Sequence, residues 1–596
     1  MKYLLLTPPL TQLNTPYPAT TVLKGFLQEH GMEVAQGDLG IELANTVLSK
    51  AFLQEVFANP ASSGWQRQTL DCIDTVMRFL RGEDNTLAPR IANRSLLPEG
   101  HRFRNLADTE WAFGTSGTED KAHYLATLFV EDVTDHIREN VDSHFDLIRY
   151  AEHLANYAPT FDEMETALRA PTTIIDRTML ALLERHIEQE RPQIVGFAIP
   201  FPGCLYGALR CGQYIKQRHP EIKTVLGGGF PNTEWRQLSE PRIFEYCDYI
   251  TLDDGEEPLL RIGMGHSLIR TYVLNSEKKV EYRDNPPTPL AAPGTPDFSG
   301  LPLKQYISLA EMTNPMHRLW SNGRWNKMMM AHGCYWHKCA FCDTSLDYIG
   351  RYESPSAKVV VNRMEHIAQQ TGVSGFHFVD EALPPKLLEE VCKEILSRGL
   401  TFSWWGNIRF EKAYTQELCD LMADAGCVAV SGGLEVASNR LLKLMNKGVT
   451  IEQTVNACRH FKQAGIMVHT YLMYGFPTET LQETVNALEV VRRMFDEGIV
   501  QSAFWHRYAM TCHSPSGTHP DLFDARRTST VPNPFCNNEV DWVPASNGNP
   551  NSAQFSYDID AVGEALRFAT FNYMHEIGLD MPLRQWFSIK IPKPTI

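Results

Sequence analysis

Residues 333–343 read GCYWHKCAFCD and hold three of the chain's thirteen cysteines in a C-x4-C-x2-C spacing. Thiolates are the usual ligands of iron–sulfur clusters, and three on one loop can bind three irons of a cubane. Cys334, Cys339 and Cys342 therefore predict a 4Fe–4S cluster whose fourth iron stays open to an external ligand.

Two other interpretations of this stretch stay open. A structural zinc ion prefers four ligands, and His332 or His337 would supply the fourth. The three cysteines can also be a chance grouping in one loop. The position of the loop favours the cluster, because it follows the first of six candidate strand–helix units, and β/α barrels carry their chemistry at the carboxyl ends of the strands.

Six apolar strands, each followed by helical periodicity, make up the region 325–515. They lie near 327–331, 375–379, 401–405, 428–431, 467–473 and 502–508. This alternation predicts a partial (β/α)6 barrel. Residues 516–596 follow as a C-terminal α extension with a helix near 561–576.

The N-terminal region, 1–265, predicts a Rossmann-like domain with a parallel sheet. Its strands near 194–199, 224–226 and 249–252 are almost wholly apolar, as in sheets covered on both faces. The strand at 3–6 is expected in the same sheet, so the helical stretch at about 49–190 reads as an insertion. A linker at 266–324, with six prolines within 283–302, joins the two domains.

Composition excludes several classes of function. The chain has 596 residues and a net charge of -16, from 55 basic and 71 acidic residues, which disfavours nucleic acid and anionic membranes as partners. The apolar run in MKYLLLTPPL is too short for a signal sequence, and no stretch of about 18 apolar residues predicts a membrane span. Cysteines scattered singly indicate a reducing, cytoplasmic setting.

The cysteine loop and the strand order of 325–515 resemble the radical S-adenosylmethionine (SAM) superfamily. That family commonly has C-x3-C-x2-C, so this chain carries one extra residue in the first gap. The resemblance implies SAM at the open iron, reductive cleavage to a 5′-deoxyadenosyl radical, and an electron donor such as flavodoxin or ferredoxin.

Polar residues follow the second and third barrel strands. Asp380 and Glu381 end the second strand, where the resemblance implies contact with the SAM amino group or with substrate; a helix cap or a solvated loop is the alternative. Arg409 follows the third strand and can pair with a carboxylate of SAM or substrate, or form a structural ion pair.

Glycine-rich turns follow the fourth and fifth strands. Gly432 and Gly433 allow a ligand to approach the backbone, and by resemblance Glu435 and Ser438 are candidate contacts to the ribose and sulfonium. Gly475 lies in a turn that is near the adenine in the family, so we expect a backbone contact there.

Glycine and proline also follow the N-terminal strands, in PFPGC (200–204) and LGGGF (226–230). Together with the proline-rich linker, these motifs resemble cobalamin-binding radical SAM proteins. The resemblance implies that Gly227, Gly228 and Gly229 approach the nucleotide tail and that Pro200 and Phe201 lie near the corrin. The chain has no D-x-H-x-x-G stretch, so cobalamin is expected to bind without a histidine below the cobalt.

The leading hypothesis is a cobalamin-dependent radical enzyme that methylates an unactivated carbon of a small-molecule or peptide substrate. The alternatives are a radical SAM enzyme that performs cyclisation, oxidation or rearrangement without methyl transfer, one whose N-terminal domain only docks substrate, and a zinc-stabilised interaction protein.

Overall fold

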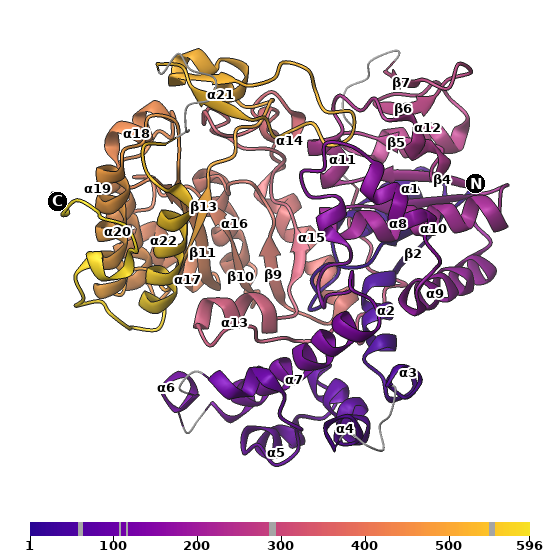
Figure 1. The fold of residues 1–596 in the computed structure, drawn as a ribbon, viewed down its shortest axis with the longest axis horizontal. Helices are drawn as coiled ribbons and strands as arrows, with labels where there is room; N and C mark the ends of the chain where they lie inside the picture. Colours follow the sequence, from indigo (N-terminus) through magenta and orange to yellow (C-terminus); the bar gives the residue numbers. More distant parts are fainter. Residues whose placement is uncertain (58–63, 107–108, 115–116, 285–293, 547–554) are drawn as a thin grey trace.

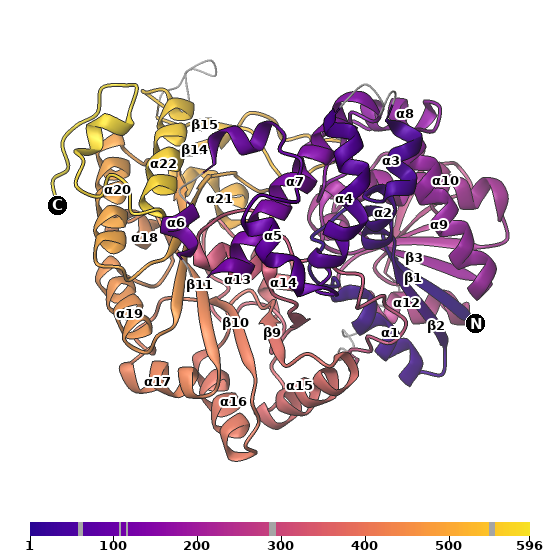
Figure 2. The same cartoon turned by 90° about the horizontal axis from the view of Figure 1, so that it is seen from below.

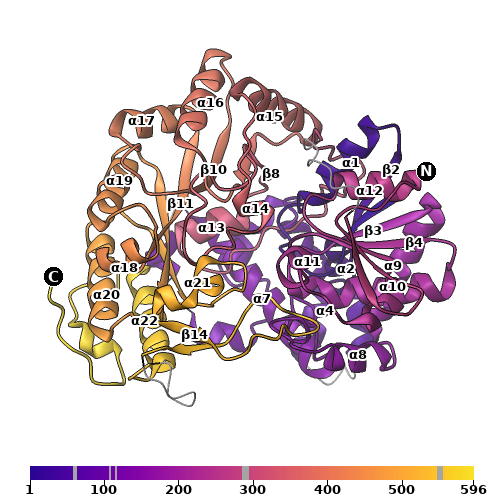
Figure 3. The ribbon, with the colours of Figure 1, turned by 90° about the horizontal axis from the view of Figure 1, so that it is seen from above.

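The computed structural model describes residues 1–57, 64–106, 109–114, 117–284, 294–546 and 555–596. Two β-sheets dominate the described chain and lie side by side, each flanked by helices (Figure 1; Figure 3). The predicted α/β class with parallel sheets and many helices is confirmed.

The N-terminal sheet has seven strands in the order β2-β1-β3-β4-β5-β6-β7. The strands from β2 to β5 run parallel, whereas β6 and β7 pair antiparallel at one edge. Their bounds are β1 Lys2–Thr7, β2 Glu33–Asp38, β3 Ile194–Ala198, β4 Lys223–Gly227, β5 Tyr249–Thr251, β6 Thr271–Leu274 and β7 Val280–Arg283. The first strand therefore joins the later ones, as the sequence predicted.

The antiparallel hairpin is a departure from the predictions. β6 and β7 lie inside 266–324, which was read as a linker, and they extend the sheet rather than leaving it. Most of the linker's prolines lie in 285–293, outside the described residues. After them comes a short helix, α13 (Pro315–Asn322), that was not predicted.

Helices α1, α10, α11 and α12 follow the strands of this sheet, and their bounds are α1 Ala19–Glu29, α10 Leu205–Arg218, α11 Gly229–Glu234 and α12 Glu256–Met264. A helical segment runs between β2 and β3. It comprises α2 Leu39–Val47, α3 Lys50–Val56, α4 Gly64–Leu80, α5 Ala88–Ala92, α6 Thr109–Phe113, α7 Thr118–Asn140, α8 Asp162–Arg169 and α9 Ile174–Glu190.

This helical segment shares one apolar core with the N-terminal sheet and also reaches the second half of the chain. Figure 1 shows α5 and α7 below the two sheets, and in Figure 2, which is seen from below, these helices lie in front. Arg318 of α13 donates to Asp120 of α7 at 2.7 Å. The segment thus contacts an element that packs on the second sheet.

The second sheet has six parallel strands in chain order, β8 to β13. Their bounds are β8 Asn326–Met328, β9 Gly375–Phe378, β10 Ser403–Ile408, β11 Cys427–Glu435, β12 Met467–Tyr474 and β13 Ser502–Arg507. The helices between them are α14 Asp347–Gly350, α15 Ala357–Thr371, α16 Pro385–Ser397, α17 Gln416–Asp424, α18 Asn439–Leu444, α19 Ile451–Gln463 and α20 Leu481–Asp496. All six strands were predicted.

The two faces of this sheet differ in chemistry. Phe376 and Phe378 of β9 pack with apolar side chains of α15 and α16. Successive strand residues point to opposite faces, so His377 lies on the other face, where its ring stacks 3.5 Å from that of Trp405. We call this second surface, which α13 covers in part, the inner face.

The C-terminal stretch contains α21 (Pro515–Thr518), α22 (Ile559–Tyr573) and two short antiparallel strands, β14 (Ala525–Arg527) and β15 (Trp542–Pro544). The predicted helix is present as α22, whereas the strand pair was missed. Within the described residues, no helix combines the length and the apolar character that a membrane crossing requires.

Candidate functional site

The cysteine loop begins where β8 ends, and Asp380 fixes its first residues. The two carboxylate oxygens of Asp380 accept main-chain hydrogen bonds from Met330 at 2.9 Å and Ala331 at 2.7 Å. The side chain is 1% exposed, and burial raises its pKa to about 7. Asp380 was predicted as a cofactor contact, but its carboxylate is occupied by the loop that it positions.

The thiols of Cys339 and Cys342 lie together, joined by a hydrogen bond between their side chains. That bond is the largest cause that lowers the pKa of Cys339, to about 6, and the charges of Lys447 and Arg409 add to it. Cys339 is buried, whereas Cys334 and Cys342 are half-buried. A thiolate at neutral pH on this loop is suited to bind a soft metal.

Two basic side chains, Arg409 and Lys447, lie next to the cysteine loop. Arg409 Nη1 lies 3.7 Å from Cys339 Sγ and its guanidinium lies 4.6 Å from the centre of the Trp336 ring. Arg409 also donates to Glu411 at 2.8 Å and to the main-chain oxygen of Lys447. Sequence reasoning left open whether Arg409 binds a carboxylate of a ligand or forms a structural ion pair, and the contacts are those of the second case.

Lys447 is a functional candidate that the sequence did not reveal. Its ammonium lies 2.6 Å from Glu435 Oε1 and 5.5 Å from the centre of the Phe341 ring. Arg409, Glu435 and Lys447 all lie near the cysteine loop, although they are distant from it in the sequence. Glu435, a predicted site residue, is thus brought to the cysteine loop through this ion pair.

The two glycines near the end of β11 are required by close packing. A Cβ on Gly433 would lie 1.9 Å from Glu435 Oε1, and a Cβ on Gly432 would lie 2.7 Å from the Phe410 ring. Ser438 caps α18 and donates to Glu483 at 2.8 Å. The predicted residues Gly432 and Gly433 therefore lie at the carboxyl edge of the sheet. The Ser438 hydroxyl caps α18.

The turn after β12 is held by a buried carboxyl. Gly475 has a φ of 82°, and its amide donates to Glu479 at 2.7 Å. Burial raises the pKa of Glu479 to about 7. The Glu479 carboxyl therefore holds this turn in place through the amides of Gly475 and Phe476.

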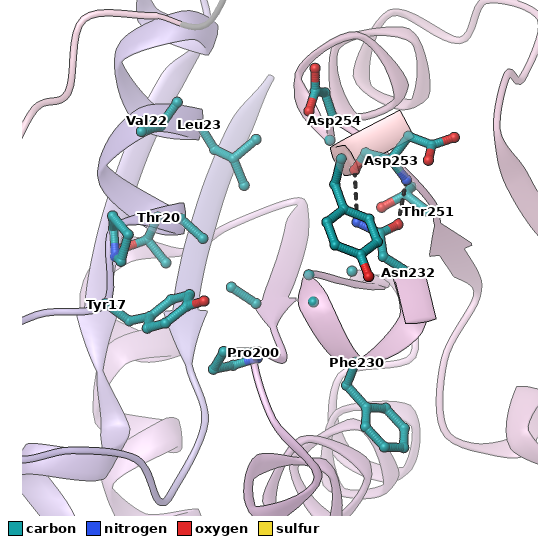
Figure 4. A pocket seen from close by; sticks show the side chains of 18 of the residues that line it. Tyr17, Thr20, Val22, Leu23, Pro200, Phe230, Asn232, Thr251, Asp253 and Asp254 are labelled. Atoms are coloured by element: carbon teal, nitrogen blue, oxygen red, sulfur yellow. Dashed lines mark hydrogen bonds between the residues drawn. The ribbon is translucent and has the colours of Figure 1, made fainter. Parts of the chain in front are cut away.

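A cavity of about 660 Å³ lies between the carboxyl edges of the two sheets (Figure 4). In the view, Tyr17, Thr20 and Pro200 line one wall, and Asn232 and Asp253 line the other. Residues of the second sheet and its loops complete the lining, namely Met328, Met329, Ala331, His332, Gly333, Tyr348, Val379 and Glu381. Of the site residues predicted on the second sheet and its loops, Glu381 is in this lining.

The predicted N-terminal residues, Pro200, Phe201 and Gly227 to Gly229, all line this cavity. Gly228 has a φ of 109°, and a Cβ there would lie 2.8 Å from the Ile199 oxygen. A Cβ on Gly229 would lie 2.8 Å from the Pro200 oxygen. These glycines let two strand-end loops of the chain itself come into close contact at the cavity wall.

A network of charges joins the cavity wall to the cysteine loop. His332 Nε2 lies 3.0 Å from Asp347, and Arg351 donates to Asp254 at 2.7 Å. The neighbouring His337 contacts the main-chain oxygen of Cys334 at 3.0 Å. His332 and His337, either of which would supply the fourth ligand of a zinc site, thus each have a polar partner within the protein.

The inner face of the second sheet also holds polar groups that the sequence did not reveal. Lys327 pairs in register with His377, lies 5.7 Å from the centre of the Tyr17 ring, and is 5% exposed. Burial lowers the pKa of Lys327 to about 7. A lysine in an apolar strand was the available signal, but its importance depends on which face of the strand is inward.

Comparisons with known proteins agree with this geometry. The family model of the radical SAM superfamily matches residues 328–491. An uncharacterized methyltransferase of Pyrococcus horikoshii is 24% identical over 315 residues, which cover 52% of this chain and 66% of that protein. The anaerobic magnesium-protoporphyrin IX monomethyl ester cyclase of Rubrivivax gelatinosus is 28% identical over 332 residues, which cover 53% and 56%.

This chain thus spans between about half and two thirds of the length of these two relatives. The solved structure of the radical SAM methyltransferase TsrM from Kitasatospora setae, with cobalamin and a [4Fe-4S] cluster bound, aligns with a TM-score of 0.49 at 15% identity. That alignment covers 87% of this chain and 77% of TsrM. Residues 328–491 thus match the radical SAM superfamily, a family whose members use a 4Fe–4S cluster and SAM.

Proposed function

We propose that Cys334, Cys339 and Cys342 hold the 4Fe–4S cluster and that the chain cleaves SAM beside it. The observation that carries this proposal is the Cys339–Cys342 thiol pair, backed by Arg409 at 3.7 Å, on a loop at the carboxyl edge of a parallel sheet. When bound, the cluster supplies an electron to SAM. The role of this chain is to favour the thiolate form of Cys339, position the loop through Asp380 and exclude water with aromatic side chains.

The SAM site is proposed at the strand ends beside the loop. Gly432, Gly433 and Glu435 at the end of β11 and Gly475 after β12 lie at the same edge of the sheet as the cysteines. The amide groups and carboxylate there can hydrogen-bond a ribose and an amino group. Glu381, which faces the cavity, is a further candidate for the amino group.

We propose cobalamin as the occupant of the cavity and methyl transfer to carbon as the reaction. The support is the place of the cavity, between the glycine turns of the first sheet and the cysteine loop of the second. Among the described residues, the lining contributed by the N-terminal sheet includes no histidine, in line with the missing D-x-H-x-x-G motif. The name of the Pyrococcus horikoshii relative supports transfer of a methyl group.

A second candidate function is ring closure or oxidation without methyl transfer. It is favoured by the similarity to the magnesium-protoporphyrin cyclase of Rubrivivax gelatinosus. Both candidates share the cluster, SAM and a low-potential electron donor such as flavodoxin or ferredoxin. The thirteen free thiols are compatible with the reducing, cytoplasmic setting proposed from sequence.

Two products distinguish these candidates. The protein is reconstituted anaerobically with iron and sulfide and incubated with dithionite, hydroxocobalamin and SAM labelled at its methyl group. The proposal expects 5′-deoxyadenosine and labelled methylcobalamin. Formation of 5′-deoxyadenosine without labelled corrinoid would support the second candidate.

The matched control is Cys458→Ala, which removes a buried thiol from α19. It is expected to form both products, whereas Cys339→Ala is expected to form neither. If Cys339→Ala still produced 5′-deoxyadenosine at the level of Cys458→Ala, the assignment of the cluster to this loop would be wrong.

A further inference from the structure

Three carboxyl groups in the wall of the cavity have no basic group at ion-pair distance among the described residues: Glu234, Glu256 and Glu381. His332 acts on Glu256 and Glu381, and Arg270 on Glu256, at longer range. Glu256 is 6% exposed at the start of α12, and Glu234 at the end of α11 has a buried Oε2 that accepts no hydrogen bond. Glu381 is exposed to the cavity after β9. They come from three separate elements around one space.

The other charged groups of the wall are accounted for. Asp253 pairs with Arg236, and Asp254 pairs with Arg351. Of the basic residues in the described lining, His332 contacts Asp347, and Arg363 has Glu29 as an acidic neighbour. Three carboxyls therefore remain to interact with whatever fills the cavity.

Burial raises the pKa of Glu234, Glu256 and Glu381 to about 7 in each case. A carboxyl in this range can donate a hydrogen bond when protonated and accept one when ionised. An amide side chain offers both a donor and an acceptor, so it suits either state. A ligand carboxylate or phosphate offers only acceptors and negative charge, which these groups would repel.

Resting on the corrinoid site proposed above, we infer that Glu234, Glu256 and Glu381 select a corrinoid whose peripheral side chains are amides and reject a polycarboxylate of the same shape. Phosphate-rich dinucleotides and porphyrins with free propionates are disfavoured in this cavity by the same charges. Such a porphyrin would have to bind elsewhere on the chain.

The test compares two corrinoids that both lack the nucleotide tail. Dicyanocobinamide carries amides, and dicyanocobyrinic acid carries carboxylates on the same ring. Binding of each to the purified full chain is measured at pH 8 by equilibrium dialysis and corrin absorbance. We expect the amide form to bind on the order of 10- to 100-fold more tightly, because like charges brought together in an interface cost several kcal/mol.

The variant Glu381→Gln should reduce the ratio of the two corrinoid affinities. The triple variant, in which Glu234→Gln and Glu256→Gln are added to Glu381→Gln, should reduce it further. Glu381 is exposed to the cavity, so the single change keeps the test valid if the triple variant folds poorly. The control is Glu221→Gln, an exposed carboxylate before β4 at the opposite edge of the sheet, which should leave the ratio unchanged.

Equal affinity for the two corrinoids, or tighter binding of the acid, would overturn this inference and leave the corrinoid site standing. A ratio that is unaffected by Glu381→Gln and by the triple variant would overturn the assignment to these carboxyls. Binding of neither corrinoid would contradict the corrinoid site itself, and with it this inference.

Discussion

Buried charged groups in the helical segment and on the inner face of the second sheet differ in whether they have polar partners. Asp176 at the start of α9 is fully buried and accepts hydrogen bonds from Tyr150 at 2.9 Å and Tyr206 at 3.1 Å. Arg210 lies 3.3 Å from it and also donates to the main-chain oxygen of Leu168 at 2.7 Å. Every part of this pair is compensated.

On the inner face, polar groups are left without partners. Lys327 forms no ion pair within the described chain, and three buried atoms accept or donate no hydrogen bond there: His469 Nε2, Ser431 Oγ and Trp405 Nε1. The Lys327 ammonium lies 5.7 Å from the centre of the Tyr17 ring, an uncharged aromatic neighbour. Burial lowers the pKa of His469 well below its usual value, and the neighbouring His317 and His506 add to this shift.

The difference separates structure from function. Buried polar groups in folded proteins are nearly always paired, since an unpaired one costs about 1–3 kcal/mol. The Asp176–Arg210 pair follows that rule and is therefore a structural support, although four other buried atoms of the helical segment form no hydrogen bond, namely Trp65 Nε1, Thr69 Oγ1, Asp132 Oδ2 and His144 Nδ1. The inner face departs from this pairing rule near the cysteine loop. Unpaired polar groups are expected where a substrate supplies the missing partners.

The largest effect is expected at the cysteine loop. Cys342→Ala removes one of three thiolates and with it the acidity that its hydrogen bond gives to Cys339. We expect complete loss of the cluster and of 5′-deoxyadenosine formation, measured by iron content and product analysis. Retention of a full cluster in this variant would show that the loop does not hold it.

The next largest effect should come from breaking the compensated pair. Asp176→Ala leaves Arg210 buried without its counter-charge, which typically costs about 3–5 kcal/mol, and it removes a capping box from α9. Urea unfolding of the apoprotein measures the change. Asp162→Ala, which removes an exposed partner of Arg242 at the start of α8, is the control and should leave the urea midpoint almost unchanged.

The opposite sign is predicted for the uncompensated lysine. Lys327→Met removes a buried amine that lacks a hydrogen-bonding partner, so the apoprotein should gain about 1–3 kcal/mol. The pKa of Lys327 is about 7 in the folded chain, below its ordinary value near 10.5, so the unfolded chain binds more protons between these values. The stability of the original chain should therefore rise with pH over that window.

It follows that the advantage of Lys327→Met is greatest below pH 7 and shrinks towards pH 10. A destabilising effect at pH 6 would contradict the contrast between the two regions. It would mean that Lys327 is compensated in the folded chain.

The smallest effect is predicted for an exposed pair. Arg440 is half exposed and lies 2.7 Å from Glu483. Arg440→Gln should change stability by less than about 1 kcal/mol and the change should fade in salt. A larger cost would show that this pair supports the Ser438 cap, since Ser438 also donates to Glu483.

Much of the fold could be predicted because apolar strands alternate with helices along both halves of the chain. The hairpin of β6 and β7 could not, since β7 reads VEYR and exposes charged side chains at a sheet edge, where no apolar pattern is required. Helix α13 is only eight residues long, too short for periodicity to mark it.

The predicted site residues were found from their places at strand ends, and those of the N-terminal sheet do line one cavity. Asp380 and Ser438 lie at the strand ends that the sequence indicated, but their side chains bond other parts of this chain. The partners of a side chain depend on packing and not on its position in a motif. Lys447, Glu234 and Lys327 depend on contacts between distant segments, which local sequence cannot reveal.

The central claim is that three thiolates of one loop bind a cubane and leave a single iron for SAM. Mössbauer spectroscopy of the anaerobic protein, enriched in iron-57 and measured with and without SAM, tests it most directly. We predict that one iron of the cluster changes its isomer shift when SAM is added, and that Cys339→Ala shows no cubane. Four irons that ignore SAM, or a cluster that survives Cys339→Ala, would contradict the account.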